Sequence, residues 1–268
     1  MNRSSFSDTA TGRPVRPLLA AVLAAFTLAA CSNTANVASG ADAEGLLKAS
    51  AAAAQAVTLS DADVMQLADK SCAEMDAKAK VASAKGKSAQ RLARLVKAMP
   101  KEVEGVTLNY KVYETREINA WAMNNGCVRV YSGLMEKMND NELRGVIGHE
   151  IGHVALGHSK KAMQVAYAAG AARQAAASAG NSAVAALTAS EIGDLAEKLV
   201  NAQFSQVQET EADDYAFDLL TTAKLKRDGL VTAFEKLAKL GDNSSMLSSH
   251  PASSERAQHI RDRIAAKK

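Results

Sequence analysis

Three of the chain's five histidines lie close together in the stretch GVIGHEIGHVALGHSKK, residues 145–161. Within it, HEIGH places His149 and His153 four residues apart, with Glu150 between them. On a helix, residues four apart lie one turn apart and about 40° apart in angle, so both imidazoles can reach one metal ion. A Zn²⁺ ion lowers the pKa of a bound water toward 7, and a neighbouring glutamate can take its proton. The spacing therefore predicts two metal ligands and a general base on one helix.

The third histidine of this stretch, His158, is a less favoured ligand. It lies nine residues after His149, which on a continuous helix is about 180° away. It would then point away from the metal, unless the helix ends at Gly157. We therefore interpret His158 as a structural or cleft-edge histidine.

The other residues of the same helix indicate how it packs. Gly148 and Gly152 each cost about 1 kcal/mol relative to alanine in a helix interior. This cost indicates that another element approaches closely, or that the glycines give access to a cleft. An apolar stripe on a different face from His149 is expected to be buried; it consists of Leu143, Ile147, Ile151 and Val154.

A catalytic zinc site needs a third protein ligand from elsewhere in the chain. The best candidate stretch is QFSQVQETEADDYAFDLL, residues 203–220, which we interpret as a second helix. Glu209 and Asp213 are four apart and share a face lined by small residues, whereas Glu211 lies on the other, solvated side. We expect Glu209 to be the ligand and Asp213 to accept a hydrogen bond from a ligating histidine.

The elements that must position these residues are mainly helical. One helix is expected to start at an N-cap at Ser60 or Asp61, and a second, SAQRLARLVKAMP, to end at Pro100. Alternating apolar residues predict a strand over 106–114, and the NNG turn at 124–126 precedes a second strand. Helices dominate from residue 140 onward. The sequence therefore predicts an α+β, mainly helical domain over 58–268, with a small β-sheet before the HExxH helix.

One alanine-rich segment inside this domain has two possible structures. Residues 168–190 are low in sequence complexity and lie between the two halves of the expected site. They form either a helical hairpin with small side chains or a mobile flap.

The N-terminus has the features of a targeting segment. Arginines precede an apolar run at 18–30, which at 13 residues is shorter than the roughly 20 residues of a transmembrane helix. This length suits the signal peptide that we expect over 1–30. The run ends in LAAC, which resembles a bacterial lipoprotein signal and implies a lipid on Cys31; an ordinary secretory signal is the alternative. Because Ser32 and not aspartate follows Cys31, the resemblance implies the outer membrane of a Gram-negative envelope. Residues 31–57 would be the lipidated N-terminus and a flexible tether.

Charge argues against one class of function, nucleic-acid binding, and the cysteine content permits one disulfide. Of the net charge of +3, residues 1–30 carry +2, so the body of the chain is nearly neutral. Nucleic-acid binding needs a concentrated basic surface and is not expected. An oxidising periplasm permits a disulfide between Cys72 and Cys127, and two buried free thiols are the alternative.

The order of motifs, HEIGHVALGH and then ETEAD, resembles the zinc metallopeptidase family that includes HtpX-type heat-shock proteases and CAAX prenyl proteases. The resemblance implies a zincin-type domain with one Zn²⁺ per chain, bound by His149, His153 and Glu209. Glu150 would be the general base, and Asp213 matches the aspartate of the family's ExxxD motif. Residues near 119–124 match an edge strand that pairs with extended substrate in this family.

The C-terminal stretch SSHPASSERAQHI resembles an HPxxxxR motif of periplasmic family members. It implies that His250 faces the zinc, as an oxyanion-stabilising group or a displaceable fourth ligand, with Arg256 behind the ligands. A loop histidine before the helix-starting Pro251 is the alternative. Because the chain lacks the transmembrane helices of the HtpX-type and prenyl proteases and an appended repeat domain, it most resembles the compact periplasmic lipoproteins of the LoiP type. Prenylated substrates are therefore not expected.

These features together predict a zinc endopeptidase of the bacterial envelope that degrades unfolded or misassembled envelope proteins. Two alternatives come from other classes: a chaperone-like binding protein for outer-membrane assembly, and a structural zinc protein with a closed site of four ligands. A peptidoglycan amidase is a weaker alternative, because no part of the chain resembles a glycan-binding module.

Overall fold

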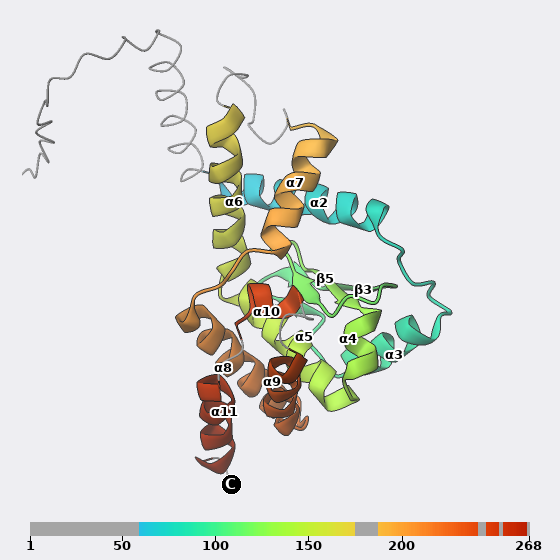
Figure 1. Cartoon of the computed structure of the whole chain (residues 1–268), viewed down its shortest axis with the longest axis vertical. Coiled ribbons are helices and arrows are strands. Elements are labelled where there is room, and N and C mark those ends of the chain that lie inside the picture. The colour runs from blue at the N-terminus through green and yellow to red at the C-terminus, as the bar shows by residue number, and fades with distance from the viewer. Residues whose placement is uncertain (1–58, 175–186, 241–244, 252–253, 267–268) are drawn as a thin grey trace, which may run out of the picture. The chain divides into compact units, whose positions relative to one another are not determined.

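A computed structural model describes residues 59–174, 187–240, 245–251 and 254–266 of the chain (Figure 1). The expected signal peptide (1–30), the lipidation site Cys31 and the tether (31–57) lie outside these residues. So do residues 175–186, which leaves the two structures considered for 168–190 undecided. Within the described part, no helix combines the length and the apolar character that crossing a membrane would require.

Helices make up most of the domain, and local sequence signals fix where several of them begin. Ser60 caps the first described helix and exchanges hydrogen bonds with Asp63, as the sequence predicts. The helices are α2 (Asp61–Lys78), α3 (Lys87–Val96), α4 (Ser132–Lys137), α5 (Asp140–Ala155), α6 (His158–Gln174), α7 (Ala189–Val200), α8 (Gln206–Thr222), α9 (Asp228–Leu240), α10 (Ser245–Ser249) and α11 (Ser254–Ala266).

A small sheet precedes the histidine-rich helix α5. Strands β3 (Asn109–Tyr113) and β5 (Cys127–Tyr131) are parallel, and β4 (Ala120–Ala122) pairs antiparallel with β5, in the order β3-β5-β4. The single strand expected over 106–114 is interrupted. Its first residues form β2 (Val106–Thr107), which turns back through Gly105 to pair with β1 (Glu102–Val103). The order β3-β5-β4 places strand β4 at an edge of the three-stranded sheet.

The central strand β5 is buried on both faces, and the two faces contact different cores. Val128 and Val130 belong to the larger core, which also contains apolar residues of α5, α8, α9 and α11. Cys127 and Tyr131 belong to the smaller core with α2, α6 and α7. This alternation follows from the two-residue period of a strand. A disulfide between Cys72 and Cys127, with Cα atoms 6.4 Å apart, ties α2 to β5 on the second face.

Helix α5 lies between the sheet and the C-terminal helices, where it packs against α8 and α9 and approaches β4 (Figure 1). Its expected apolar stripe is buried: Leu143, Ile147 and Ile151 are fully inaccessible, and Val154 is nearly so. The prediction of an α+β, mainly helical domain with a small sheet before this helix is confirmed.

Candidate metal centre

Two capped helices, α5 and α8, carry most of the residues expected in the metal site. Asn139 caps α5 by accepting hydrogen bonds from the backbone N–H groups of Asn141 and Glu142. Ser205 caps α8 in the same way, so α8 begins at Gln206 and Glu209 falls in its first turn. Backbone dipoles give a helix N-terminus a partial positive charge, which favours a carboxylate at that position.

The glycines of α5 allow α8 to approach it closely, as their cost in a helix interior predicts. A Cβ atom on Gly152 would lie 2.9 Å from the backbone oxygen of Ala212 in α8, which is closer than real Cβ contacts. A Cβ atom on Gly148 would lie 3.3 Å from the Cβ of Ala216. The small residues on both helices therefore bring the histidine face of α5 next to the Glu209 face of α8.

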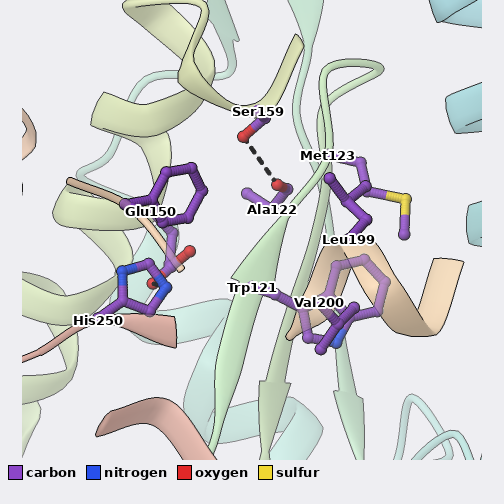
Figure 2. A pocket seen from close by; sticks show the side chains of 9 residues that line it. Trp121, Ala122, Met123, Glu150, Ser159, Leu199, Val200 and His250 are labelled. Carbon is purple, nitrogen blue, oxygen red and sulfur yellow. Dashed lines mark hydrogen bonds and ion pairs between the residues drawn. The ribbon is translucent and has the colours of Figure 1, made fainter. Parts of the chain in front are cut away.

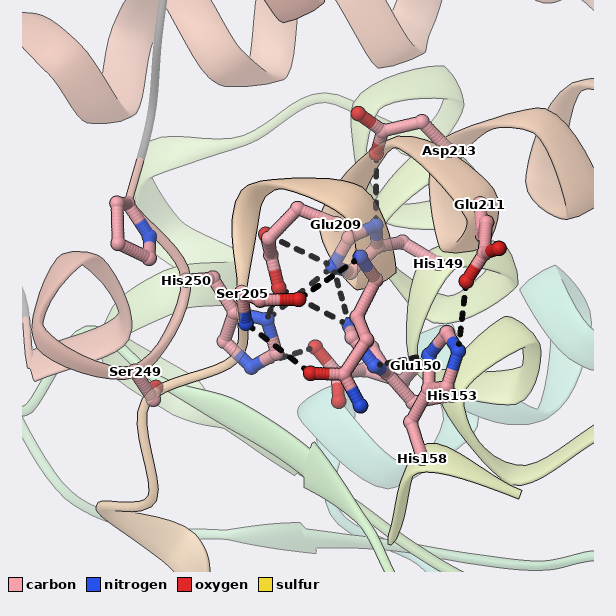
Figure 3. A network of polar contacts seen from close by, with 12 residues as sticks. His149, Glu150, His153, His158, Ser205, Glu209, Glu211, Asp213, Ser249 and His250 are labelled. Atoms are coloured by element: carbon pink, nitrogen blue, oxygen red, sulfur yellow. Dashed lines mark hydrogen bonds and ion pairs between the residues drawn. The ribbon is translucent and has the colours of Figure 1, made fainter. Parts of the chain in front are cut away.

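Four buried donor groups meet between these helices and the segment before α11 (Figure 3). The Nε2 atoms of His149 and His153 are 3.0 Å apart. Glu209 Oε1 lies 3.2 Å from His153 Nε2 and 3.0 Å from His250 Nδ1. His250 Nδ1 in turn lies 3.2 Å from His149 Nε2. Ligands 2.0–2.1 Å from one tetrahedral zinc ion are about 3.3–3.4 Å from one another, so the donor set fits such an ion.

Glu150 lies beside the donors without joining them. Its side chain is buried, and among the described residues its Oε1 atom has no hydrogen-bond partner; His250 Nε2 lies 3.6 Å from it. The pKa of Glu150 is raised above its usual range, because burial disfavours the carboxylate more than the charges on His250 and His149 favour it. A carboxyl with a raised pKa and an unused acceptor is suited to taking a proton from a water molecule at the metal.

Asp213 and Arg256 support the donors from behind. Asp213 Oδ1 lies 2.7 Å from His149 Nδ1, on the side of the ring away from the cluster. Arg256 donates two hydrogen bonds of 2.7 Å to the carboxylate of Asp213 and a further one to Glu209 Oε2. These contacts fix the ring of His149 and the carboxylate of Glu209 in the orientation that a ligand needs.

The electrostatics of the cluster keep its carboxylates ionised. Burial alone would raise the pKa of Glu209, but His149, His153 and His250 outweigh it, so the pKa lies far below its usual range. Burial would likewise raise the pKa of Asp213, but hydrogen bonds from Arg256 and His149 lower it. Ionised carboxylates next to imidazoles are the form that binds a divalent cation.

His158 is not among the four donors, as expected, but the helix does not continue to it; the alternative that the sequence left open, a helix end before His158, is observed. Helix α5 ends at Ala155, and Gly157 adopts φ +73°, a left-handed conformation that favours glycine. After this turn His158 lies beside the site, where its Nδ1 is 3.1 Å from His153 Nδ1. Glu211, which we expected to be only solvated, is half-exposed and lies 3.1 Å from His158 Nε2.

An apolar wall beside the donors was not foreseen from the sequence. The ring of Phe204 stacks on that of His153 with centroids 3.9 Å apart, and the backbone N–H of Phe204 donates to Ser249. Phe204 also lines a cavity together with residues of β4 and the end of α7, among them Leu199 and Val200 (Figure 2). Its volume is about 10 Å³, room for about one water molecule. Only the apolar character of these residues could have drawn attention to them.

The edge strand β4 passes along the same cavity, as Figure 2 shows. The carbonyl of Ala122 accepts a hydrogen bond from the Ser159 hydroxyl at the start of α6, and the N–H of Ala120 is bonded by the Asn119 side chain. Trp121, Ala122 and Met123 of the segment 119–124 therefore line the cavity together with Glu150. Strand β4 lies at an edge of the sheet, and these two backbone groups on it are paired within the chain.

Comparison with known proteins gives consistent matches. A sequence model of the family described as "Peptidase family M48" matches residues 86–264 of the chain. The chain is 54% identical to Metalloprotease LoiP of Escherichia coli (strain K12) over 254 residues, which are 94% of this chain and 98% of that protein. It is 51% identical to Metalloprotease YcaL of the same organism over 253 residues, again 94% of this chain and 98% of that protein. A shorter match of 37 residues, 60% identical, is to Protease HtpX of Acinetobacter baumannii (strain AYE); it covers 14% of this chain and 12% of that protein.

Proposed function

Because the chain belongs to peptidase family M48 and is a metalloprotease, we propose that it is a zinc-dependent endopeptidase that uses Glu150 as its general base. The observation that carries the proposal is the buried Glu150, whose Oε1 atom has no hydrogen-bond partner among the described residues and lies next to a cluster of three histidines and a glutamate that could hold a metal ion. Imidazole and carboxylate donors in a tetrahedron are typical of zinc.

A zinc ion held by His149, His153 and Glu209 would polarise a peptide carbonyl and lower the pKa of a nearby water toward 7. Glu150 would accept a proton from the attacking water and then pass it to the amine of the leaving peptide. Asp213 would hold the proton on Nδ1 of His149, which leaves Nε2 free to bind the metal. A substrate strand paired with β4 would lie beside Glu150.

The fourth donor, His250, occupies the position that a catalytic site keeps for water or substrate. The cavity beside it, of about 10 Å³, has room for about one water molecule and not for a peptide. We therefore infer that His250 is a displaceable fourth ligand, and that the described arrangement is a closed form of the enzyme. A purely structural zinc site would also have four donors, but it does not need a buried glutamate beside them whose Oε1 atom has no hydrogen-bond partner among the described residues.

The proposal can be tested with Glu150→Gln, which keeps the size of the side chain and removes the base. We expect cleavage of an unfolded protein by the zinc-loaded enzyme to fall about 10²–10⁴-fold, with zinc still bound. Glu136→Gln is a matched control, because Glu136 is exposed on α4. Full cleavage by the Glu150 variant would contradict the mechanism. Unchanged function in cells together with no cleavage by the wild type would favour the chaperone-like alternative.

We also propose that the enzyme acts in the bacterial envelope, on unfolded or misassembled outer-membrane and periplasmic proteins, from a lipid anchor on Cys31. The LAAC sequence after an apolar run supports the anchor, and the similarity to two proteins of a Gram-negative bacterium supports the location. Cys31→Ser is expected to abolish incorporation of labelled fatty acid and to move the protein from the outer-membrane fraction to the soluble periplasm. If the wild-type protein incorporates no labelled fatty acid, the proposed lipid anchor on Cys31 is refuted.

A further inference from the structure

The two histidines of the HExxH motif differ in what lies behind them. The Nδ1 atom of His149 contacts the carboxylate of Asp213 directly, at 2.7 Å. Among the described residues no carboxylate contacts the Nδ1 atom of His153, which lies 3.1 Å from Nδ1 of His158. The Nε2 atom of His158 lies 3.1 Å from Glu211 Oε2, which completes a row of three side chains (Figure 3).

Only one assignment of protons suits this row when His153 binds a metal. Its Nε2 atom faces the other donors, so a neutral His153 must carry its proton on Nδ1. That N–H donates to His158 Nδ1, which must then be unprotonated. The proton of His158 is therefore on Nε2, where it donates to Glu211. Each group has one role, and the row ends on a half-exposed carboxylate.

The surroundings of His153 make this contact important. His153 is 1% exposed, and stacking with Phe204 covers one face of its ring. His158 is the one hydrogen-bond partner found for His153 Nδ1 among the described residues. Without it, a buried N–H would be left unpaired whenever His153 binds metal, and a buried donor without a partner is costly.

We propose that His158 and Glu211 are positioning residues that fix His153 in its metal-binding tautomer, as Asp213 does for His149. The inference rests on the metal binding proposed above. The turn at Gly157 makes the arrangement possible, because it directs His158 toward His153 although the two are five residues apart. Glu211 acts through His158 and touches neither the donors nor the cavity.

Zinc affinity tests this role without depending on cleavage. The full chain is titrated against a chromogenic zinc chelator, and the dissociation constants of the variants are compared. His158→Ala is expected to bind zinc about 10–100-fold more weakly. His158→Asn is expected to restore most of the affinity, because its Oδ1 atom can take the place of Nδ1 as the acceptor. Equal affinity of His158→Ala and the wild type, or equally weak binding by the Asn variant, would overturn the proposal.

The chain contains a matched control, because His259 and Asp214 form another pair, with atoms 2.7 Å apart, that is not part of the donor cluster. His259→Ala should leave zinc affinity unchanged, and a loss equal to that of His158→Ala would overturn the specific role. If His158→Ala does not fold, Glu211→Ala carries the test. Glu211→Ala should weaken zinc binding at least about threefold, less than His158→Ala, because Glu211 is partly exposed and contacts His158 and not His153. Unchanged zinc affinity would refute the positioning role of His158 and Glu211.

Failure of this inference is distinguishable from failure of the proposed function. If the wild type binds zinc and cleaves protein while His158→Ala keeps full affinity, only the positioning role is wrong. If the wild type binds no zinc, the proposed function and the positioning role both fail.

Discussion

The contact between α5 and α8 can be tested by adding one methyl group at each of two glycines. Gly152→Ala and Gly148→Ala each gain about 1 kcal/mol of helix propensity, so this gain cancels when the two variants are compared. What remains is the difference in the space available. At Gly152 the new Cβ would be 2.9 Å from a backbone oxygen and 3.1 Å from a backbone Cα atom of Ala212. At Gly148 it would meet the side chain of Ala216 at 3.3 Å.

The two sites therefore differ in what must move. Backbone atoms of α8 cannot rotate away from the methyl group at Gly152, so the helices must separate. Overpacking of a buried contact costs about 1–3 kcal/mol. We expect Gly152→Ala to be less stable than Gly148→Ala by about 1–2 kcal/mol, which for a domain of this size corresponds to a difference of about 2–8 °C in Tm.

The separation should also reach the metal centre. Ala212 follows Glu209 by three residues on the same face of α8, and His153 is next to Gly152 on α5. Zinc affinity should therefore fall in Gly152→Ala more than in Gly148→Ala. Urea unfolding in the presence of a chelator measures the difference in stability, and competition with a chelator measures the difference in zinc affinity. If Gly152→Ala is as stable as Gly148→Ala, the inference that this contact has no room for a methyl group is refuted.

Three further predictions concern the donor His250, the bound zinc and the partly buried carboxylate of Asp76. His250→Ala should weaken zinc binding but increase cleavage of a short peptide at saturating zinc, because it opens the fourth position; a lower rate would instead indicate an oxyanion role. Chelating the zinc should lower Tm by about 8–16 °C from its value at a free zinc concentration of about 1,000 times Kd, since such a ligand contributes about 4 kcal/mol; an unchanged Tm would show that the folded chain binds no zinc. Burial alone would raise the pKa of Asp76, but hydrogen bonds from Arg129, Lys111 and Tyr113 outweigh it and lower the pKa to about 2. The ionised Asp76 therefore contributes its full stabilisation above the unfolded pKa of 3.8, and this contribution is lost as the pH falls toward 2. In urea titrations at acid pH, the free energy of unfolding should fall more steeply with decreasing pH in the wild type than in Asp76→Asn. Equal dependence on pH in the two proteins would contradict this.

Local patterns in the sequence were sufficient for the parts of the site that lie on single helices. The spacing of His149 and His153 defines one helix face, and the capping residues Asn139 and Ser205 fix where α5 and α8 begin. The glycines of α5 and the small residues near Glu209 indicated that two helices approach each other closely. These are short-range properties, because helical periodicity and capping depend on residues within one or two turns.

The direction of His158 could not be obtained in this way. Periodicity over a continuous helix places it opposite His149, but α5 ends at Ala155, and Gly157, which has a positive φ, lies between α5 and α6. The same turn made Glu211 a partner of His158, although on α8 it lies away from the Glu209 face. A single backbone dihedral angle thus changed the role of two residues.

By itself, the sequence of this chain determined which residues can do chemistry: a histidine pair with a base on one helix, and a glutamate four residues before an aspartate on another. Only the tertiary structure decided which of them meet. It brought His250 to the other donors across 97 residues from His153, and it placed Phe204 against the ring of His153. Contacts of this kind depend on how whole helices pack, and packing is set by the complete core and not by any local pattern.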